Sequence, residues 1–461
     1  MTRALVYGLA VAGESTVRAL QRRDIEVVVA DDEITPSRTT VASTLNVELI
    51  KRPRGQVLDA LVGSCDLVCP APGVPETHEL VRAAKESDVE LVSEIELAYR
   101  WEQQRPGGPR PMLAITGTDG KTTTTLLAVE MLRAAGLKTV DAGNTLTPLV
   151  DAIEQDLDAF VVECTSFRLA WTPSFRAEAA VWLNLAPDHL NWHRSMSSYE
   201  AAKARVFANQ GPTDVAIGFV NDEAVMRHLA TAPGQHRTFG ANNADYCLAS
   251  TAGQANKGGV LSGPAGEIAP VSAMRRSLPH DITNALAASA LVLESGLAGP
   301  NAITSALTSF EGPAHRLEHV ATWDDIAWFN DSKATTPHAA SAAIRSFENL
   351  ILIAGGYDKG VDLSAMAANT DRIRAVIALG ATAPAVAAAF SDVSNVRTVD
   401  DLAAAVTYAN EIAQPGNVVL FSPGCASFDQ YKSFEQRGDH FRSLVQSALS
   451  TTQSSLPGGT S

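Results

Sequence analysis

Residues 112–127 are MLAITGTDGKTTTTLL, and this stretch decides how the middle of the chain folds. Its apolar start predicts a buried strand, and the residues that follow Lys121 predict a helix. Between them, Gly117 and Gly120 let the backbone curl so that consecutive N–H groups face a phosphate, and the helix presents its positive N-terminus to the same anion. Lys121 would offset the charge of the β- and γ-phosphates, and the Thr122 hydroxyl would bind Mg²⁺. We therefore expect a phosphate-binding loop here.

The match to the strict P-loop pattern is incomplete. G-x-x-x-x-G-K-[ST] requires glycine at position 115, where this chain has Ile115. A tight strand-to-helix turn that binds no ligand stays an alternative, although the order of strand, loop and helix favours the phosphate site. The candidate ATP-binding residues of the loop are Gly117, Thr118, Asp119, Gly120, Lys121, Thr122 and Thr123.

Length and composition limit the class of protein. The chain has 461 residues, enough for roughly three domains that each bury a core. Hydrophobic residues make up 46% and charged residues 19%, which excludes a mainly disordered chain. The net charge of −15 is spread, with −4 over 1–110, −6 over 111–313 and −5 over 314–461. Without a cluster of Lys and Arg, we expect neither nucleic acid nor an anionic membrane as a partner.

Cysteine usage and the N-terminus predict a cytoplasmic protein. The five cysteines are odd in number and lack C-x-x-C spacing, as expected for reduced thiols. The start, MTRALVYGLAVAG, resembles a signal peptide, but a buried strand over 4–7 and a helix over 15–22 also account for the next strand, 26–30. No transmembrane helix is expected, because the most apolar uncharged stretch, 375–391, contains Gly380 and is shorter than ~18 residues.

Short apolar runs alternate with amphipathic stretches, the pattern of parallel sheets covered by helices, so we expect an α/β fold. Three blocks are predicted as domains, separated first by the Pro/Gly linker RPGGPRP at 105–111 and then by EGPAHR at 311–316. The predicted bounds are 1–104, 111–312 and 313–450, followed by a disordered tail over 451–461. In the second and third blocks the predicted strands are 112–116, 159–163, 179–185, 214–219, 326–330, 350–354, 375–379 and 418–421, and the predicted helices are 281–296 and 301–310.

Further polar groups follow buried strands of the second block. In VVECTSF, Glu163 ends an apolar strand, where it could hold the metal of a nucleotide or cap a helix. In NLAPDHL, Asn184, Asp188 and His189 come after the next strand, where α/β sheets gather ligand-binding groups. His189 is as compatible with a structural role as with metal binding, and the H-L-N-W-H spacing is not that of a zinc protease. Lys203, within YEAAKARVF, is most simply a solvated lysine on a helix.

The outer blocks carry similar loops. GLAVAG at 8–13 lacks the middle glycine of a dinucleotide fingerprint, although Asp31 and Asp32 could still contact the ribose of a nucleotide. In the third block, FNDSKATTPHA contains an acid, a lysine and small hydroxyls that suit ribose and phosphates: Asp331, Ser332, Lys333, Thr335 and Thr336. Helix capping explains Asp331 or Thr336 equally well. Two more glycine loops, AGGYDKG and SPGCASFDQY, follow strands and indicate a site near a domain junction.

These motifs together resemble those of a known family. TGTDGKTT, VECTSF, NLAPDHL, YEAAKARVF, PHDITNALAA, GPAHRLE, FNDSKATTPHAA and SPGCASFDQYKSFEQRGDHF occur in the order typical of the Mur ligases of peptidoglycan precursor synthesis. The last motif, with APGVP at 71–75, is similar to that of the members that add D-glutamate. The resemblance covers nearly the whole chain.

The resemblance implies an ATP-dependent amide ligase of three domains: a Rossmann-like N-terminal domain, a central P-loop ATPase domain and a Rossmann-like C-terminal domain. The implied substrates are ATP, UDP-N-acetylmuramoyl-L-alanine and D-glutamate. The carboxylate of the UDP-sugar would attack the γ-phosphate to give an acyl phosphate, which the amine of D-glutamate would then attack. A cytoplasmic monomer is expected.

The resemblance also implies roles for individual residues. Thr122 and Glu163 would hold one of two Mg²⁺ ions, and His189 would help to hold the second, supported by a carbamate on Lys203. Lys121 would clamp the phosphates and Asn144 would lie near the reacting carboxylate. The remaining matches are Asn284, Arg316 and Asp331 for ATP; Gly8, Leu9, Asp31, Ala71, Pro72, Gly73 and Asn144 for the UDP-sugar; and Lys359, Thr335, Ser427, Phe428 and Phe434 for D-glutamate.

Some positions depart from the family pattern, and other functions stay open. Asp119 replaces a common asparagine in the phosphate loop, so we expect its carboxylate to point away from the nucleotide. Asp32 and Glu33 stand where some relatives carry Thr-Arg contacts to the uridine nucleotide. Alternatives are another amino-acid-adding Mur ligase, a folylpolyglutamate synthase-like ligase, a regulatory P-loop ATPase and an inactive nucleotide-binding module. An inactive module would be expected to lose some of the chemical groups, so the joint presence of four of them argues against it: Lys121, Glu163, His189 and Lys203.

Overall fold

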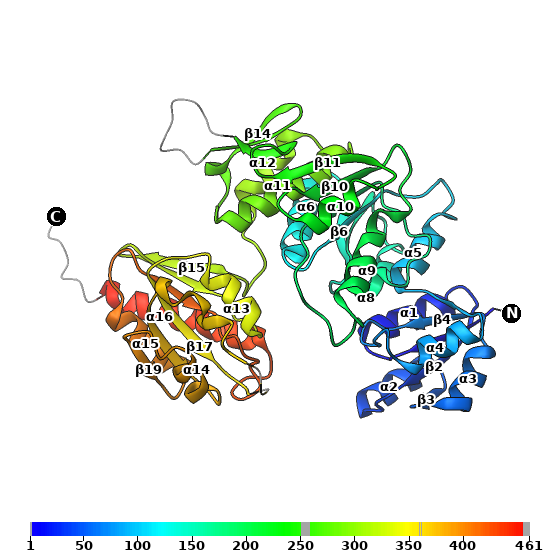
Figure 1. The fold of residues 1–461 in the computed structure, drawn as a ribbon, viewed down its shortest axis with the longest axis horizontal. Helices are drawn as coiled ribbons and strands as arrows, with labels where there is room; N and C mark the ends of the chain where they lie inside the picture. The colour runs from blue at the N-terminus through cyan, green and yellow to red at the C-terminus, as the bar shows by residue number, and fades with distance from the viewer. Residues whose placement is uncertain (1, 250–258, 359, 361, 455–461) are drawn as a thin grey trace. The chain divides into compact units, whose positions relative to one another are not determined.

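The computed structural model describes residues 2–249, 259–358, 360 and 362–454, with side chains up to 449. The chain forms two compact units, Met1–Phe310 and Glu311–Ser461. The first unit contains two sheets and the second contains one, each flanked by helices (Figure 1). The prediction of three α/β domains is therefore confirmed.

The N-terminal sheet has five parallel strands in the order β3-β2-β1-β4-β5, the arrangement of a Rossmann-like half. The predicted strands over 4–7 and 26–30 are both present, and the first helix begins at Val11, four residues earlier than predicted. The strands are β1 (Arg3–Tyr7), β2 (Glu26–Asp31), β3 (Leu49–Lys51), β4 (Leu67–Pro70) and β5 (Glu90–Leu91), and the helices are α1 (Val11–Gln21), α2 (Pro36–Leu45), α3 (Gly55–Gly63), α4 (Glu79–Glu86) and α5 (Glu94–Glu102).

The central sheet has nine strands in the order β14-β13-β12-β11-β10-β9-β6-β8-β7. All pairs are parallel except those that join β12, β13 and β14, so these three strands form an antiparallel extension after residue 241, and none of them was predicted. The strands are β6 (Met112–Thr116), β7 (Thr139–Gly143), β8 (Ala159–Glu163), β9 (Ala179–Trp182), β10 (Val215–Phe219), β11 (Gln235–Gly240), β12 (Tyr246–Ala249), β13 (Val260–Gly263) and β14 (Gly266–Pro270). The helices are α6 (Lys121–Ala134), α7 (Leu149–Ala152), α8 (Ser166–Leu169), α9 (Met196–Ala208), α10 (Glu223–Leu229), α11 (Pro279–Glu294) and α12 (Pro300–Ser309), with a 3₁₀ turn at Val271–Ala273.

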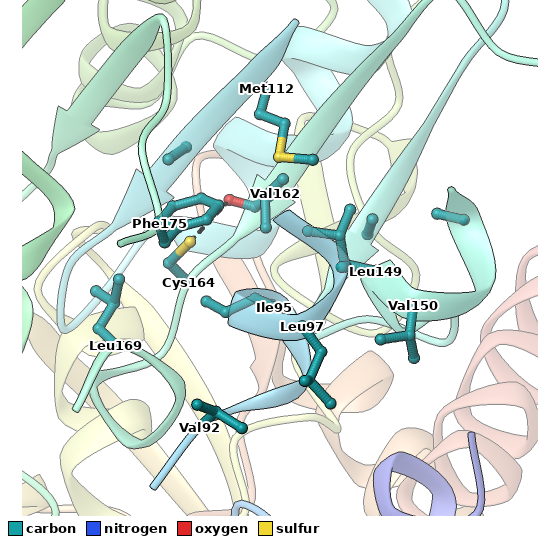
Figure 2. Packing of buried hydrophobic residues seen from close by; sticks show 14 of the residues in the cluster. Val92, Ile95, Leu97, Met112, Leu149, Val150, Val162, Cys164, Leu169 and Phe175 are labelled. Carbon is teal, nitrogen blue, oxygen red and sulfur yellow. Dashed lines mark hydrogen bonds between the residues drawn. The ribbon is translucent and has the colours of Figure 1, made fainter. Parts of the chain in front are cut away.

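Helix α5 precedes the predicted linker but packs with central elements. Ile95 and Leu97 lie in one hydrophobic cluster with Leu149, Val162 and Phe175 (Figure 2). Polar contacts support the same packing, since the buried carboxylate of Glu96 accepts hydrogen bonds from the backbone N–H groups of residues 174 and 175. The exact bounds of the first two domains stay predictions, but the core of the first unit is continuous across residues 105–111.

The C-terminal sheet has the order β15-β16-β20-β17-β18-β19. All its pairs are parallel except β15 with β16, and this antiparallel edge strand was not predicted. The strands are β15 (Glu318–Trp323), β16 (Ile326–Asn330), β17 (Leu350–Gly355), β18 (Ile373–Leu379), β19 (Val396–Thr398) and β20 (Val418–Phe421), and the helices are α13 (Pro337–Ile344), α14 (Ala383–Ala389), α15 (Leu402–Ile412) and α16 (Phe434–Ser454), with a 3₁₀ segment at Met366–Arg372.

Three smaller expectations can be compared with the fold. Helix α16 extends to Ser454, so the first four residues of the predicted tail 451–461 are helical, and 455–461 lie outside the described residues. All five cysteines are free thiols. Within the described ranges, no helix is both long and apolar enough to cross a bilayer.

Candidate active site

The carboxyl ends of four adjacent parallel strands, β9-β6-β8-β7, meet at one edge of the central sheet. The register pairs Ile115 of β6 with Glu163 of β8, and Glu163 with Gly143 of β7. The phosphate loop after β6 therefore lies between Asn184, which follows β9, and Glu163. Parallel sheets gather ligand-binding groups at this edge, so the sequence-predicted residues of the central domain come together in one place.

The loop has the curled backbone that a phosphate site needs. Gly120 has φ +85°, and a Cβ there would lie 2.6 Å from Oδ1 of Asn284. The backbone N–H groups of Thr118 and Asp119 both donate to Oδ1 of Asn184, at 3.0 and 2.8 Å. The Asp119 side chain is exposed, consistent with the expectation that it points away from the loop. Consecutive N–H groups therefore converge on one acceptor, as they would on an anion.

Two lysines converge on a single backbone oxygen of the loop. Nζ of Lys121 donates to the carbonyl of Gly117 at 2.8 Å, and Nζ of Lys203 donates to the same oxygen at 2.6 Å. Lys203 is only 1% exposed, so the interpretation of a solvated helix lysine was wrong: this face of α9 packs against the loop. Burial, aided by the charge of Lys121, holds the pKa of the Lys203 amine well below its usual range.

Glu163 has one carboxylate oxygen in use and one to spare. Its side chain is 1% exposed, and Oε1 accepts a hydrogen bond from Nδ2 of Asn144 at 2.8 Å. Oε2 is buried and has no hydrogen-bond partner among the described residues. Leaving a buried carboxylate oxygen unpaired is costly, whereas a cation there would satisfy it. This orphaned oxygen fits the magnesium ligand expected at this position.

His189 has an environment that keeps its imidazole neutral. Burial, aided by the charges of Lys121 and Lys203, lowers the pKa of His189, although Asp188 acts in the opposite direction. Its backbone is in the left-handed region, at φ +55°, and the ring packs edge-on against Phe167 with centroids 4.6 Å apart. A neutral imidazole is the form that binds metals.

The donor set for metal is mixed. No group of three or more His, Cys, Asp or Glu residues that could hold an ion exists within the described part of the chain. The candidate ligands Thr122, Glu163, His189 and Lys203 instead combine a hydroxyl, a carboxylate, an imidazole and an amine. Such a set suits an ion completed by oxygens of the phosphates and of a modified lysine.

Asn284 joins the site from another helix. It lies on α11, and its Oδ1 accepts a hydrogen bond from the Thr124 hydroxyl on α6 at 3.3 Å. Thr122 is half-buried and Thr123 is buried in the first turn of α6. These side chains and Asn284 surround the positive N-terminus of α6, where a phosphate would be favoured.

The N-terminal candidates surround the end of β1. Asp31 is buried, and its carboxylate accepts from the backbone N–H groups of Leu9 at 2.7 Å and Glu33 at 3.0 Å and from Arg38 at 2.9 Å. Asp31 therefore holds the shape of this loop, and its carboxylate has little capacity left for a ribose. The other candidates line the same region: Gly8, at φ +100°, faces Ala71, and the Pro72 carbonyl accepts from Trp192 at 2.8 Å, while Gly73 is the next residue of that loop.

Asp32, one of the positions that departs from the family pattern, belongs to a compact polar cluster. It accepts a hydrogen bond from the Tyr7 hydroxyl at 2.7 Å and pairs with Arg54 at 3.0 Å and His78 at 3.2 Å. Burial alone would raise the pKa of Asp32, but these donors hold it below its usual value. The cluster places a cation and a hydroxyl at the end of the sheet, next to the glycine loop.

Three loops of the C-terminal unit are joined by backbone hydrogen bonds. They follow the adjacent parallel strands β16, β20 and β17, and Gly424 N–H donates to the Ala334 carbonyl while Tyr357 N–H donates to the Ala426 carbonyl, both at 2.9 Å. Asp331 is buried and accepts from Ser422 Oγ at 2.6 Å and from the backbone N–H of Leu317. These loops also carry half-buried Thr335, buried Ser427 and Phe428, which is 63% exposed. Of the other candidates, Arg316 precedes β15, Phe434 is the first residue of α16, and Lys359 lies outside the described residues.

Sequence reasoning assigned no role to several residues that organise these sites. Arg437 is 1% exposed and donates to the carbonyls of Ser332, Cys425 and Ala426, which ties two of the C-terminal loops together. Burial lowers the pKa of Arg437 to about 10. Arg168 contacts Asn144 in the central domain, and Glu94 pairs with Arg168. Arg437 stands inside a recognisable motif and Arg168 directly follows one, but no local pattern distinguishes them from surface arginines.

Comparisons with known proteins cover nearly the whole chain. Three family models match: "Mur ligase MurD-like, N-terminal domain" at residues 2–93, "Mur ligase middle domain" at 115–292 and "Mur ligase, glutamate ligase domain" at 315–425. The UDP-N-acetylmuramoylalanine--D-glutamate ligase of Frankia casuarinae is 38% identical over 452 residues, which cover 96% of this chain and 93% of the relative. The enzyme of the same name from Pelotomaculum thermopropionicum is 36% identical, covering 96% and 97%.

Among solved structures, the UDP-N-acetylmuramate-alanine ligase of Thermotoga maritima has a TM-score of 0.57 at 17% identity. The alignment covers 97% of this chain and all of that one. At this identity the likeness concerns the fold alone, and it extends over the three domains.

Proposed function

Because the chain belongs to the Mur ligase family, we propose that it is an ATP-dependent ligase that joins D-glutamate to UDP-N-acetylmuramoyl-L-alanine. The observation that carries this proposal is the match along nearly the full chain to ligases named for D-glutamate. The geometry agrees with it, since the phosphate loop, the two converging lysines and the spare Glu163 oxygen all lie at one edge of the central sheet.

The chemistry needs two anions to meet. The carboxylate of the UDP-sugar attacks the γ-phosphorus of ATP, ADP leaves, and an acyl phosphate forms. The amine of D-glutamate then attacks the acyl carbon, and phosphate leaves as the amide forms. Lys121 and the N–H groups of the loop would stabilise the phosphate charge during the first step, while Asn144 would orient the reacting carboxylate.

Magnesium would be held by Thr122 and Glu163 at one site and by His189 with a carbamate of Lys203 at a second. When bound, Mg²⁺ offsets the repulsion between the carboxylate and the triphosphate. A carbamate forms when an unprotonated amine attacks CO₂ and loses a proton, and the buried Lys203 amine is suited to this reaction because burial and Lys121 disfavour its ammonium form. The resulting carbamate is an anion and would attract the Lys121 ammonium, whereas a protonated Lys203 would repel it.

The outer domains would select the other substrates. For the UDP-sugar we propose the loops that carry Gly8, Leu9, Asp31, Ala71, Pro72 and Gly73, with Asp31 acting by holding the loop backbone. For D-glutamate we propose Thr335, Lys359, Ser427, Phe428 and Phe434, and for ATP also Asn284, Arg316 and Asp331. We further propose a monomer that acts in the cytoplasm, where ATP and the nucleotide sugar are available.

One assay tests the proposed reaction. Phosphate release from ATP is measured in the presence of UDP-N-acetylmuramoyl-L-alanine and Mg²⁺, with D-glutamate, L-glutamate, L-alanine or diaminopimelate as the amine. We expect turnover with D-glutamate alone. Turnover with another amino acid but not with D-glutamate would overturn the specificity, and ATP hydrolysis that is independent of the amine would favour a regulatory ATPase.

A further inference from the structure

A buried chain of polar contacts leads from helix α5 to the carboxylate of Glu163, and it ends on Oε1. Oε1 of Glu94 accepts from Nε of Arg168 at 3.1 Å, and Nη1 of Arg168 donates to Oδ1 of Asn144 at 2.7 Å. Nδ2 of Asn144 then donates to Oε1 of Glu163 at 2.8 Å. The side chains of Glu94 and Arg168 are 3% and 7% exposed, so water competes little for these contacts.

The chemistry of the four side chains fixes which atom donates and which accepts in each of these hydrogen bonds. A guanidinium has donors and no acceptor, so the Asn144 atom that faces Arg168 must be the amide oxygen. The amide NH₂ is then forced toward Glu163, whose carboxylate can only accept. Because that bond uses Oε1, the carboxylate is held with Oε2 as its unpartnered oxygen. The orientation of a single amide thus decides which oxygen of Glu163 is left for a cation.

Arg168 is itself held from the N-terminal side of the unit. Glu94 is the first residue of α5, and its Oε2 accepts the backbone N–H of Val150 at 3.3 Å. The same first turn of α5 contains Ile95 and Leu97, which pack beside Leu149 and Val162 in the central core (Figure 2). Glu94 therefore cannot move without disturbing this cluster, and its carboxylate fixes the guanidinium plane of Arg168.

We propose that Glu94 and Arg168 are positioning residues that orient Asn144 and thereby keep Oε2 of Glu163 free for Mg²⁺. This inference rests on the proposed function for the metal, but not on the identity of the amino acid that is added. Without Arg168, the amide of Asn144 is free to rotate, and an orientation that turns Oδ1 toward Glu163 would set two acceptors against each other. The Glu163 carboxylate would then turn away from Asn144, and the cation would lose a preorganised ligand.

The matched control is a second buried ion pair on the same helix. Arg110 pairs with Glu102 of α5 at 2.7 Å, with side chains 9% and 2% exposed, and it also donates to the carbonyls of Ile153 and Gln155. Arg110 contacts none of the proposed metal ligands. Arg110→Met therefore removes a similar buried pair without affecting Asn144.

The test uses the full chain without any amino-acid substrate. The rise in thermal unfolding midpoint caused by ADP is measured against Mg²⁺ concentration, which gives a half-saturating concentration for each variant. We expect Arg168→Met to raise that concentration about 10-fold or more, within the range for removal of a group that supports a metal ligand. Arg110→Met should leave it unchanged, although both variants lower the unfolding midpoint of the free protein. Equal half-saturating concentrations for the two variants would overturn the proposal.

Two further variants keep the result decisive. Asn144→Asp preserves an acceptor for Arg168 but removes the donor to Glu163, so the double variant with Arg168→Met should bind Mg²⁺ no worse than Asn144→Asp alone. If the two substitutions raise the half-saturating Mg²⁺ concentration independently, so that their fold-changes multiply in the double variant, Arg168 does not act through Asn144. Should Arg168→Met fail to fold, Glu94→Gln retains the guanidinium and is expected to change the Mg²⁺ dependence in the same direction; wild-type Mg²⁺ dependence in Glu94→Gln would refute its positioning role. A failure of D-glutamate specificity would leave all these measurements intact.

Discussion

Lys203 offers the sharpest test of the proposed chemistry, because its amine and that of Lys121 share one acceptor. The two nitrogens lie 2.6 and 2.8 Å from the Gly117 oxygen, so they are at most about 5.4 Å apart. Two cations at that separation repel by about 3 kcal/mol at an effective dielectric constant of ~20. This repulsion, with burial, favours the neutral amine of Lys203, and conversion of that amine to a carbamate would add an attraction to Lys121 of about 3 kcal/mol before solvation costs.

The perturbation is Lys203→Ala, assayed by phosphate release with saturating substrates. We expect kcat to fall by about 10³-fold, because an anion that supports the metal and offsets Lys121 is lost. Short carboxylic acids such as formate, acetate or propionate should restore part of the activity, since they supply a carboxylate to the space left by the side chain. The wild-type protein should lose activity when CO₂ and bicarbonate are removed and regain it when bicarbonate returns.

Arg205→Ala is the control for damage to helix α9. Arg205 lies two residues further along the helix and donates to the Thr172 carbonyl at 2.9 Å, away from the phosphate loop. Its removal should leave turnover and the response to bicarbonate unchanged. Full activity of Lys203→Ala without added carboxylate would refute the carbamate. A loss that no carboxylate of any length rescues, in a folded variant, would count against it as well.

Two other predictions concern a glycine of the phosphate loop and a half-buried acid, Glu76. Gly120→Ala should weaken ATP binding at least about 10-fold by calorimetry, because φ is +85° and the new Cβ would meet Asn284 at 2.6 Å, whereas Gly136→Ala, at φ +88° with open space around it, should cost only about 1 kcal/mol of stability. Glu76 accepts hydrogen bonds from donors in residues 194–198 that hold its pKa below the usual value although burial acts to raise it, so its contribution is present at neutral pH and lost as pH falls through the folded pKa. Glu76→Gln should therefore reduce the free energy of unfolding at pH 7 by about 2 kcal/mol, which is measured as a lower unfolding midpoint. The difference in midpoint between the variant and the wild type should become smaller below about pH 4.

The strands were the most predictable part of the fold. Four predicted strands, 112–116, 159–163, 326–330 and 418–421, coincide with β6, β8, β16 and β20, because buried parallel strands are continuous apolar runs bounded by loops. The strand predicted over 179–185 ends at Trp182, since Asn184 leaves the sheet to bond the phosphate loop. The edge strand β15 was missed because its polar, half-exposed residues carry no apolar run.

The site was predictable where its groups are consecutive and obscure where they are assembled from distant segments. The phosphate loop could be recognised from residues 117–123 alone. The burial of Lys203 could not, because the helix has almost no amphipathic pattern and the side chain is covered only when α9 packs against that loop. Glu94 and Arg168 are 74 positions apart in sequence, and their pairing depends on α5 packing in the core of the following domain.

The proposed metal site differs from the other strand ends in how many oxygens of its buried carboxylate accept hydrogen bonds. Each of the three domains places an acid at or just after the end of an inner strand: Asp31 is the last residue of β2, Glu163 is the last residue of β8, and Asp331 follows β16. Asp31 uses both oxygens for the backbone and Arg38, and Asp331 uses both for Ser422 and the Leu317 N–H. A cation at either would have to displace bonds that hold a loop, at a cost of about 1–3 kcal/mol for each group left unpaired. Glu163 alone among the three keeps an unpartnered buried oxygen, so a cation there would gain a ligand without breaking a contact. The same sequence pattern therefore has a structural role in two domains and a chemical role in one, and the difference lies in whether the surrounding fold leaves an oxygen unused.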